Sequence, residues 1–302
     1  MIDYKLLQAL AKVVEEGGFE RAARVLYLTQ SAISQRVRQL EDSCGQVLLT
    51  RTNPPQPTAA GRTLLKHYQQ VRMLEDGLAL ELTATSLERP QSLSIGINAD
   101  SLAFWFVAAA APVLQTMNLL LDLRVADQEQ THRYLRDGEV VGCVSNEPRP
   151  MQGCRVDALG GMRYRLLATP EFCRRWFPAG LSKAALEQAP AVIFNRNDHL
   201  QQSFVERYFS SEPINFAAHY IPAPEQFLQV IAAGYCYGMV PDWQAGKLLQ
   251  EGTLQEVIPA ATLTIELYWH CWNLTTEPLQ QLSTQLVSGA RRLLEQEKEP
   301  LF

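Results

Sequence analysis

Polar side chains recur at helical spacing near the N-terminus, opposite an apolar stripe. Between about Gln30 and Asp42, Ile33, Val37 and Leu40 repeat every three or four residues, which predicts one buried helix face. The opposite face carries Ser31, Gln35 and Arg38, and Gln30, Ser34 and Arg36 add further groups that can form hydrogen bonds. Glutamine pairs well with adenine and arginine with guanine in the major groove. This helix therefore has the side chains of a DNA-recognition helix, with Arg36 placed to reach phosphate.

The segments around this helix fit the same interpretation. Asp3 is a plausible cap for a first helix that ends at Gly17-Gly18, a short second helix covers about 20–26, and Thr29 can cap the third. The prolines of 50–57 then predict a loop or hairpin, where Arg51 could contact phosphate or enter the minor groove. The alternatives are an ordinary solvated helix face and a plain connecting turn. The combination of helix, preceding helix and wing favours DNA binding.

The net charge of −5 conceals two parts of opposite sign. Residues 1–72 hold ten Lys and Arg against six Asp and Glu, or +4, and the remainder holds seventeen against twenty-six, or −9. A basic head on an acidic body suits a chain that meets nucleic acid at one end only. The 302-residue length and 47% apolar content predict two or three folded units and exclude a disordered chain.

A second group of polar residues follows three expected strands of the body. Asn98, Asp100 and Ser101 come after a strand at 93–97, Asp127 after one at 119–125, and Ser145 ends one at 140–145. Open α/β sheets bind ligands at the carboxyl ends of their strands. These side chains should therefore converge on one cleft, although capping of the next helix by Asp100 or Ser101 explains either residue alone.

The body alternates short strands and helices, which predicts an α/β fold with mostly parallel sheets. Thr58 is expected to cap a helix of about 25–30 residues that connects the head to this body. Further strands are expected at 165–168, 191–194, 237–240 and 266–272. Helices are expected at 102–114, 129–137, 182–188, 199–208, 225–234, 243–250 and 277–295. Trp105 is expected in the core, and Asp198-His199 at a helix start.

Catalytic and metal-binding patterns are weak. The five histidines lack metal-ligand spacing, the six cysteines form no Cys-x-x-Cys pair, and no nucleophile elbow or glycine-rich phosphate loop occurs. The start has no apolar signal region, and the longest apolar run, Leu102–Leu114, is too short to span a bilayer. The sequence predicts a reduced, cytoplasmic, non-enzymatic protein without a metal or cofactor.

Several stretches resemble the LysR-type transcriptional regulators across nearly the whole chain. In the head these are Phe19-Glu20-Arg21-Ala22-Ala23, Thr29 to Val37, and Thr58-Ala59-Ala60-Gly61. In the body, the stretch from Ala233 to Pro241 resembles the effector-domain signature. Within the family, the stretches Arg51 to Thr58, Asn98 to Leu102 and Leu267 to His270 are most similar to the arginine/lysine-exporter regulators, also described as chromosome-initiation inhibitors.

The resemblance implies a winged helix–turn–helix at 1–58, a linker and dimerisation helix at 59–89, and an effector-binding domain at 90–302. That domain would resemble periplasmic binding proteins, with subdomain I at about 90–162 and 265–302 and subdomain II at about 163–264. It also implies a homodimer, often a homotetramer, on promoter DNA with RNA polymerase as a partner, located at the nucleoid. The effector would be lysine or arginine, with Asp100 and Asp127 at its cationic end and Ser101 at its carboxylate.

Two other classes stay open at this point. One is an architectural or replication-origin DNA-binding protein whose body only dimerises, which an effector-insensitive footprint would support. The other is an enzyme or solute-binding protein built on the α/β body. A body that binds ligand while the full chain ignores DNA would support that class.

Overall fold

The head of the computed structural model, which describes residues 2–82, 90–209 and 212–294, holds three helices. They are α1 (Tyr4–Glu15), α2 (Phe19–Val25) and α3 (Gln30–Cys44). The Asp3 carboxylate accepts from the Lys5 amide at 2.8 Å and the Thr29 hydroxyl from the Ala32 amide at 3.2 Å, which confirms both expected caps. The stripe of Ile33, Val37 and Leu40 is buried in a core shared with α1 and α2.

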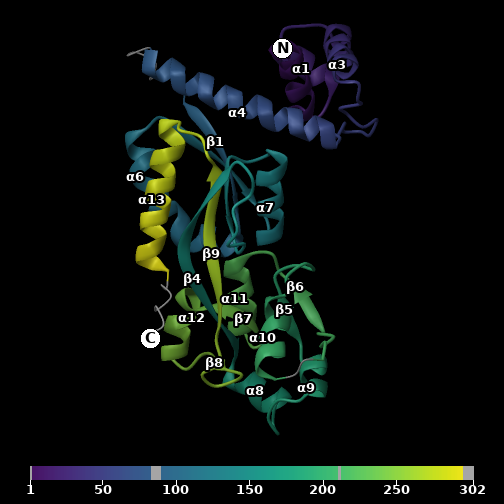
Figure 1. Cartoon of the computed structure of the whole chain (residues 1–302). Coiled ribbons are helices and arrows are strands. Elements are labelled where there is room, and N and C mark those ends of the chain that lie inside the picture. The colour runs from purple at the N-terminus through teal and green to yellow at the C-terminus, as the bar shows by residue number, and fades with distance from the viewer. Residues whose placement is uncertain (1, 83–89, 210–211, 295–302) are drawn as a thin grey trace.

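A wing follows α3 and leads directly into the long helix. Leu49 and Pro57 form an antiparallel bridge, and the Thr50 amide donates to the Gln56 carbonyl at 2.7 Å. The Thr58 hydroxyl accepts from the Gly61 amide at 3.1 Å, so Thr58 caps α4 (Ala59–Leu82) as expected. Helix α4 crosses the end of the elongated body, with the head at its N-terminal end (Figure 1). Residues 83–89, where the expected linker would end, lie outside the described part.

One mixed sheet runs through both lobes of the body (Figure 1). Its central path is ordered β2-β1-β3-β9-β4-β7, with β8 paired to β4. The strands are β1 (Gln91–Ile97), β2 (Leu119–Val125), β3 (Gly142–Ser145), β4 (Cys154–Ala168), β7 (Gly238–Pro241), β8 (Gln255–Glu256) and β9 (Leu263–Trp272). Only β1 with β2 and β1 with β3 are parallel pairs within this sheet.

The expectation of mostly parallel sheets is therefore wrong. Strands β4 and β9 pair antiparallel from Cys154/Trp272 to Tyr164/Leu263, with a register shift between Ala158 and Gly160. The chain enters the second lobe along β4 and returns along β9, so the two neighbours must run in opposite directions. Helix–strand alternation predicts parallel crossovers only where consecutive strands lie in the same lobe.

Helices cover both faces of the first lobe's sheet (Figure 1). On one face lie α5 (Ala99–Ser101), the π-helical segment η1 (Leu102–Phe106), α6 (Val107–Thr116) and α13 (Glu277–Leu293), and on the other lies α7 (Gln128–Asp137). Gly289 of α13 packs so closely on α6 that an added Cβ would lie 2.4 Å from the Ala109 Cβ. Trp105 is fully buried beneath these helices, as expected.

The second lobe is smaller and mostly helical. It contains α8 (Pro170–Trp176), α9 (Lys183–Gln188), β5 (Ala191–Ile193), α10 (Leu200–Tyr208), β6 (Ala218–Tyr220), α11 (Pro224–Ala232) and α12 (Asp242–Gln250). Strands β5 and β6 pair in parallel, and a bridge from Ala191 to Tyr237 ties them beside β7. Among the described residues, no helix is both long and apolar enough to cross a membrane.

Candidate recognition face and effector cavity

The predicted recognition residues lie on the free face of α3. Gln30, Ser31, Gln35 and Arg38 are exposed, and Ser34 and Arg36 are partly exposed. The side chains of Ser31, Gln35 and Arg38 stand opposite the buried stripe of the same helix, and those of Gln30, Ser34 and Arg36 lie to either side of it. The Ser31 hydroxyl lies 2.9 Å from that of Thr29, at the start of the helix. Arg51 is exposed in the wing. Amides and guanidinium groups are thus available on one surface of the basic head.

Tyr27 is a further exposed residue of the head that sequence reasoning missed. It occupies the turn between α2 and α3 with a φ of 54°, a backbone conformation that L-residues other than Asn and Asp seldom adopt. Its side chain is 95% exposed, so it contributes nothing to the core. The only sequence signal was the bend expected at Tyr27-Leu28.

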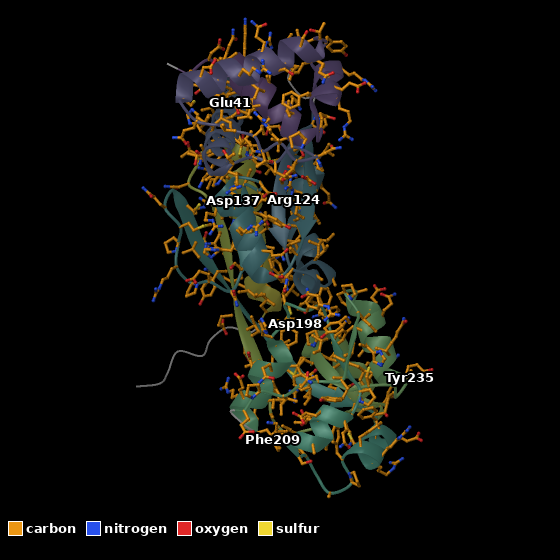
Figure 2. The ribbon with its side chains drawn as sticks, turned by 90° about the vertical axis from the view of Figure 1, so that its right-hand side faces the viewer. Glu41, Arg124, Asp137, Asp198, Phe209 and Tyr235 are labelled. Carbon is orange, nitrogen blue, oxygen red and sulfur yellow. The ribbon has the colours of Figure 1, made fainter. Side chains whose placement is uncertain are left out.

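A cavity of about 240 Å³ lies between the two lobes of the body. The first lobe and the strands β4 and β9 contribute Asn98, Ala99, Asp100, Ala126, Asp127, Asn146, Tyr164 and Ile265. The second lobe contributes Phe194, Asn195, Asn197, Asp198, His199, Leu200 and Ser203. Figure 2 places Asp198 at the junction of the lobes. Among the described residues, three aspartates and no lysine or arginine line this space, so it is acidic.

The Asp100 carboxylate is fixed by a hydrogen bond from β4. The Tyr164 hydroxyl donates to its Oδ2 at 2.7 Å. Burial raises the pKa of Asp100, the Tyr164 hydrogen bond opposes that rise, and the negative charge of Asp198 adds to it. Two neighbouring carboxylates destabilise each other's charged form, and one cation placed between them stabilises the charged form of both.

Asp127 has both a structural and a cavity-facing position. It lies after β2, where the sequence placed it, and its Oδ1 accepts from the Gln130 amide at 2.8 Å as the N-cap of α7. The same residue lines the cavity. Asp127 therefore both caps α7 and contributes a carboxylate to the cavity wall.

Of the five predicted effector residues, Asn98, Asp100 and Asp127 converge on the cavity, and Ser101 and Ser145 do not reach its lining. Ser101 is fully buried, and its hydroxyl has no hydrogen-bond partner among the described atoms. The Ser145 hydroxyl accepts from the Glu147 amide at 3.2 Å. The Asn98 Oδ1 is buried and has no hydrogen-bond partner among the described atoms, so it is an acceptor available to a ligand.

The second-lobe wall was missed by sequence reasoning. Asp198-His199 lies at a helix start as expected: His199 is the N-cap residue of α10, and the Asp198 Oδ1 accepts from the Leu200 amide at 2.9 Å. Its Oδ2 also accepts from the Phe194 amide at 3.3 Å, which holds the carboxylate at the cavity. The usable signal was the polar run Asn195–Asp198 after a strand. Within the described ranges, no three His, Cys, Asp or Glu side chains group as a metal site.

Two family models match the chain, and together they span both parts of this architecture. The model for bacterial regulatory helix-turn-helix proteins of the LysR family matches residues 4–62, and the LysR substrate-binding domain model matches residues 89–288. The chain belongs to the LysR family of bacterial transcriptional regulators. It is a DNA-binding regulator rather than an enzyme, as are the relatives of similar length described next.

The similar proteins include regulators named ArgP and LysG. The chain is 44% identical over 294 residues to the HTH-type transcriptional regulator ArgP of Aeromonas salmonicida, which covers 97% of this chain and 98% of that protein. The crystal structure of ArgP from Mycobacterium tuberculosis matches with a TM-score of 0.86 and 36% identity, over 98% of this chain and all of that one. Full-length LysG from Corynebacterium glutamicum with bound effector Arg matches with a TM-score of 0.79 and 31% identity, over 97% and 100%.

Proposed function

We propose that this regulator senses a basic amino acid, lysine or arginine, and controls a promoter for amino-acid export or metabolism. The observation that carries the proposal is the cavity lined by Asp100, Asp127 and Asp198 without a lysine or arginine. An ammonium or guanidinium group relieves the repulsion among these carboxylates, whereas an acidic ligand would add to it. The relatives named ArgP, and LysG with bound Arg, support the same ligand class.

The cationic end of the ligand belongs between Asp100 and Asp198, with Asp127 adding charge at the first-lobe wall. A ligand there would contact both lobes at once, because Asp100 precedes α6 and Asp198 precedes α10. The α-ammonium group can reach the free Asn98 Oδ1. The role that the resemblance implies for Ser101 is left out of this proposal, because Ser101 is buried and is not among the residues that line the cavity.

The remaining parts serve DNA binding and assembly. We assign residues 1–58 to the winged head, 59–89 to the linker and 90–302 to the effector-binding domain, with subdomain limits near 162 and 265. Leu74, Leu78 and Leu82 are exposed along one side of α4, which suits dimerisation through this helix and assembly to a tetramer. The dimer would bind interrupted-dyad promoter DNA and contact RNA polymerase, in the cytoplasm at the nucleoid.

The proposed mechanism is a shift between two arrangements of the lobes. A ligand that contacts both walls binds the more closed arrangement better, and it shifts the population by that difference in affinity. The paired heads then change their spacing on DNA.

A thermal-shift titration against the twenty amino acids tests this function. A ligand at 100 times its Kd adds about 2.7 kcal/mol to the folded state. For a body of about 200 residues this gives roughly 5–10 °C. A shift with lysine or arginine alone supports the proposal. Shifts with acidic or neutral amino acids alone would refute the basic-amino-acid sensor. No shift with any of the twenty amino acids, together with an unchanged DNA footprint, would also refute it and would favour the architectural alternative.

The variant Asp127→Ser sharpens this test. Serine still caps α7, so the helix stays intact while the cavity loses one negative charge. We expect a smaller thermal shift with arginine than in the wild type and an unchanged melting temperature without ligand. Asp42→Ser, at an acidic residue of the head remote from the cavity, should leave the arginine shift unaltered.

A further inference from the structure

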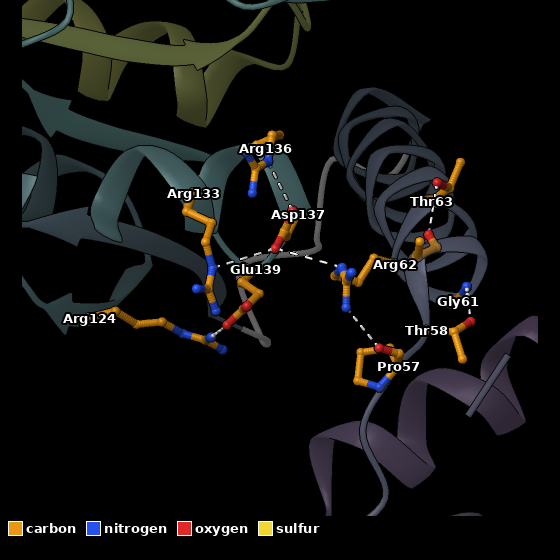
Figure 3. Close-up of polar contacts among 11 residues, drawn as sticks. Pro57, Thr58, Gly61, Arg62, Thr63, Arg124, Arg133, Arg136, Asp137 and Glu139 are labelled. Carbon is orange, nitrogen blue, oxygen red and sulfur yellow. Dashed lines mark hydrogen bonds and ion pairs between the residues drawn. The ribbon is translucent and has the colours of Figure 1, made fainter. Parts of the chain in front are cut away.

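Helix α7 has one end in the cavity wall and the other against the linker helix. It contains ten residues, which corresponds to about 15 Å. Its N-cap Asp127 lines the cavity. Its C-terminal residue Asp137 lies 3.7 Å from Arg62 of α4, between the Asp137 Oδ2 and the Arg62 Nε. One helix thus reaches from the cavity to the DNA-binding part of the chain. Figure 3 shows the Asp137–Arg62 contact at its C-terminal end.

The contact at the C-terminal end of α7 is a close backbone contact. Gly138 ends the helix with a φ of 79°. An added Cβ there would lie 2.6 Å from the Lys66 Cβ and 2.8 Å from the Lys66 Cα, so only a glycine fits against α4. Asp137 is held there by Arg133 and Arg136 of its own helix as well as by Arg62. A shift of this end of α7 would therefore press on α4.

The region of α4 that α7 touches is joined directly to the wing. The Arg62 Nη1 donates to the Pro57 carbonyl at 2.8 Å, while its Nε faces Asp137. The Thr58 hydroxyl donates to the Val47 carbonyl at 2.8 Å, and the Thr58 amide donates to the Leu48 carbonyl at 2.9 Å. Gly61 packs on that same carbonyl. The wing and the first two turns of α4 therefore form one unit.

We propose that α7 relays the state of the cavity to the wing, through the Gly138–Lys66 contact and the Asp137–Arg62–Pro57 interactions. The inference rests on the proposed function in placing a ligand beside Asp127. Because α7 also packs on β1 and β3, with Thr131 donating to the Val144 carbonyl at 2.8 Å, it moves with the cavity wall. A change in that wall thereby alters the position of the wing relative to the body.

Hydrogen exchange in the full-length protein tests the relay without knowledge of the operator. The readout is the exchange rate of the Thr50 and Thr58 amides, which are bonded within the wing. In Gly138→Ala, the methyl group forces α7 from α4, and we expect these amides to exchange several-fold faster without ligand. Gly153→Ala is the matched control, because Gly153 also has a positive φ but an added Cβ there meets nothing within 4 Å.

A milder pair of variants covers the case in which Gly138→Ala fails to fold. Asp137→Asn removes the charge that faces Arg62, and Arg133→Gln removes a partner of Asp137 that belongs to α7 itself. Asp137→Asn should speed wing exchange about two- to five-fold, the scale of a partly exposed ion pair. Arg133→Gln should not. Wing exchange equal to wild type in Asp137→Asn would overturn the relay.

Arginine and lysine serve as probes in the second arm. In the wild type, saturating ligand should change the exchange rate of the Thr50 and Thr58 amides. In Asp137→Asn, the same ligand should still raise the melting temperature, but the exchange rate of these amides should no longer change. A wing response that persists in Asp137→Asn would overturn the relay. If neither amino acid raises the melting temperature, the proposed effector is wrong, and the ligand-free arm alone decides the relay.

Discussion

Phe104 and Trp243 stack face to face across the two lobes, with ring centroids 5.1 Å apart and planes 4° from parallel. Phe104 belongs to the π-helical segment η1 of the first lobe and Trp243 to α12 of the second. The stack therefore holds the lobes together outside the cavity lining. Aromatic pairs contribute about 0.5–1.5 kcal/mol beyond the area that they bury.

Phe104→Ala should destabilise the body by about 1–3 kcal/mol, since it loses both the stack and part of the buried area. Urea unfolding of the full-length protein measures this difference. Val107→Ala, at an exposed position in the next turn, is the control and should change stability by less than about 0.5 kcal/mol. Equal effects of the two substitutions would rule out a stabilising role for the stack.

Asp100→Asn should stabilise the ligand-free protein and abolish its response to basic amino acids. Burial raises the pKa of Asp100, so the folded protein favours the protonated carboxyl over the charged one. The contribution of this preference to the free energy of unfolding is full below the unfolded pKa near 3.8, and it is lost as the pH rises through the folded pKa. The asparagine oxygen can still accept from Tyr164. A higher melting temperature at pH 7 and a lost arginine shift are expected. A lower melting temperature would contradict the burial cost.

Acid should destabilise the first lobe through a histidine pair. The rings of His132 on α7 and His270 on β9 lie 5.2 Å apart edge to face, and burial lowers the pKa of both. Because the folded pKa is lowered, the free energy of unfolding is highest at pH values above the unfolded pKa near 6.5. It decreases as the pH falls below 6.5, by at most about 1.4 kcal/mol per pH unit for each histidine.

Melting temperatures between pH 8 and pH 5 test this pair. His132→Phe keeps an edge-to-face contact without a titrating group, so its melting temperature should fall less steeply than that of the wild type. The exposed His219→Gln should follow the wild-type curve. Parallel curves for His132→Phe and the wild type would show that the pair does not titrate in this range.

Gly61→Ala should destabilise the head, although alanine normally stabilises a helix relative to glycine by about 0.8–1.0 kcal/mol. The added Cβ would lie 2.2 Å from the Leu48 carbonyl oxygen, so the wing must move. Gly77→Ala, further along α4 at ordinary contact distance from Thr276, is the matched comparison. Thermal unfolding should place the two variants on opposite sides of the wild type, and the reverse order would refute the close packing.

Gln35→Ala should lower affinity for a footprinted promoter site by about 1–3 kcal/mol and spare binding to random DNA. Arg51→Ala should weaken both and reduce the salt dependence by about one ion. Binding isotherms at several salt concentrations separate these effects. Equal losses on both DNAs in Gln35→Ala would remove its role in sequence recognition.

Local signals in the sequence predicted the head and most elements of the body. Asp3, Thr29 and Thr58 each cap a helix because the side chain and the amide that it accepts from are only two or three residues apart. The expected strand at 119–125 matches β2, and the expected helix at 277–295 begins with α13 at Glu277, although residue 295 lies outside the described part. Caps and periodic apolar patterns depend on few neighbours, so they survive tertiary packing.

Long-range pairing could not be predicted in the same way. Only 165–168 of β4 was expected as a strand, because the first part of β4 is interrupted by Gly160-Gly161 and pairs with β9, about a hundred residues away. The cavity also depends on contacts between distant parts of the sequence. Asp100 and Asp127 follow strands of the first lobe, whereas Asp198 and Tyr164 reach the site only once β4 and β9 bring the second lobe alongside.

The two lobes are joined by the paired strands β4 and β9, and this limits how they can move. Sliding one strand past the other would break every hydrogen bond between them, whereas twisting the ribbon keeps the bonds. The register shift between Ala158 and Gly160 interrupts the ladder and makes that place the softest. A twist of the β4–β9 ribbon about this register shift is therefore the change in lobe arrangement that costs the fewest hydrogen bonds.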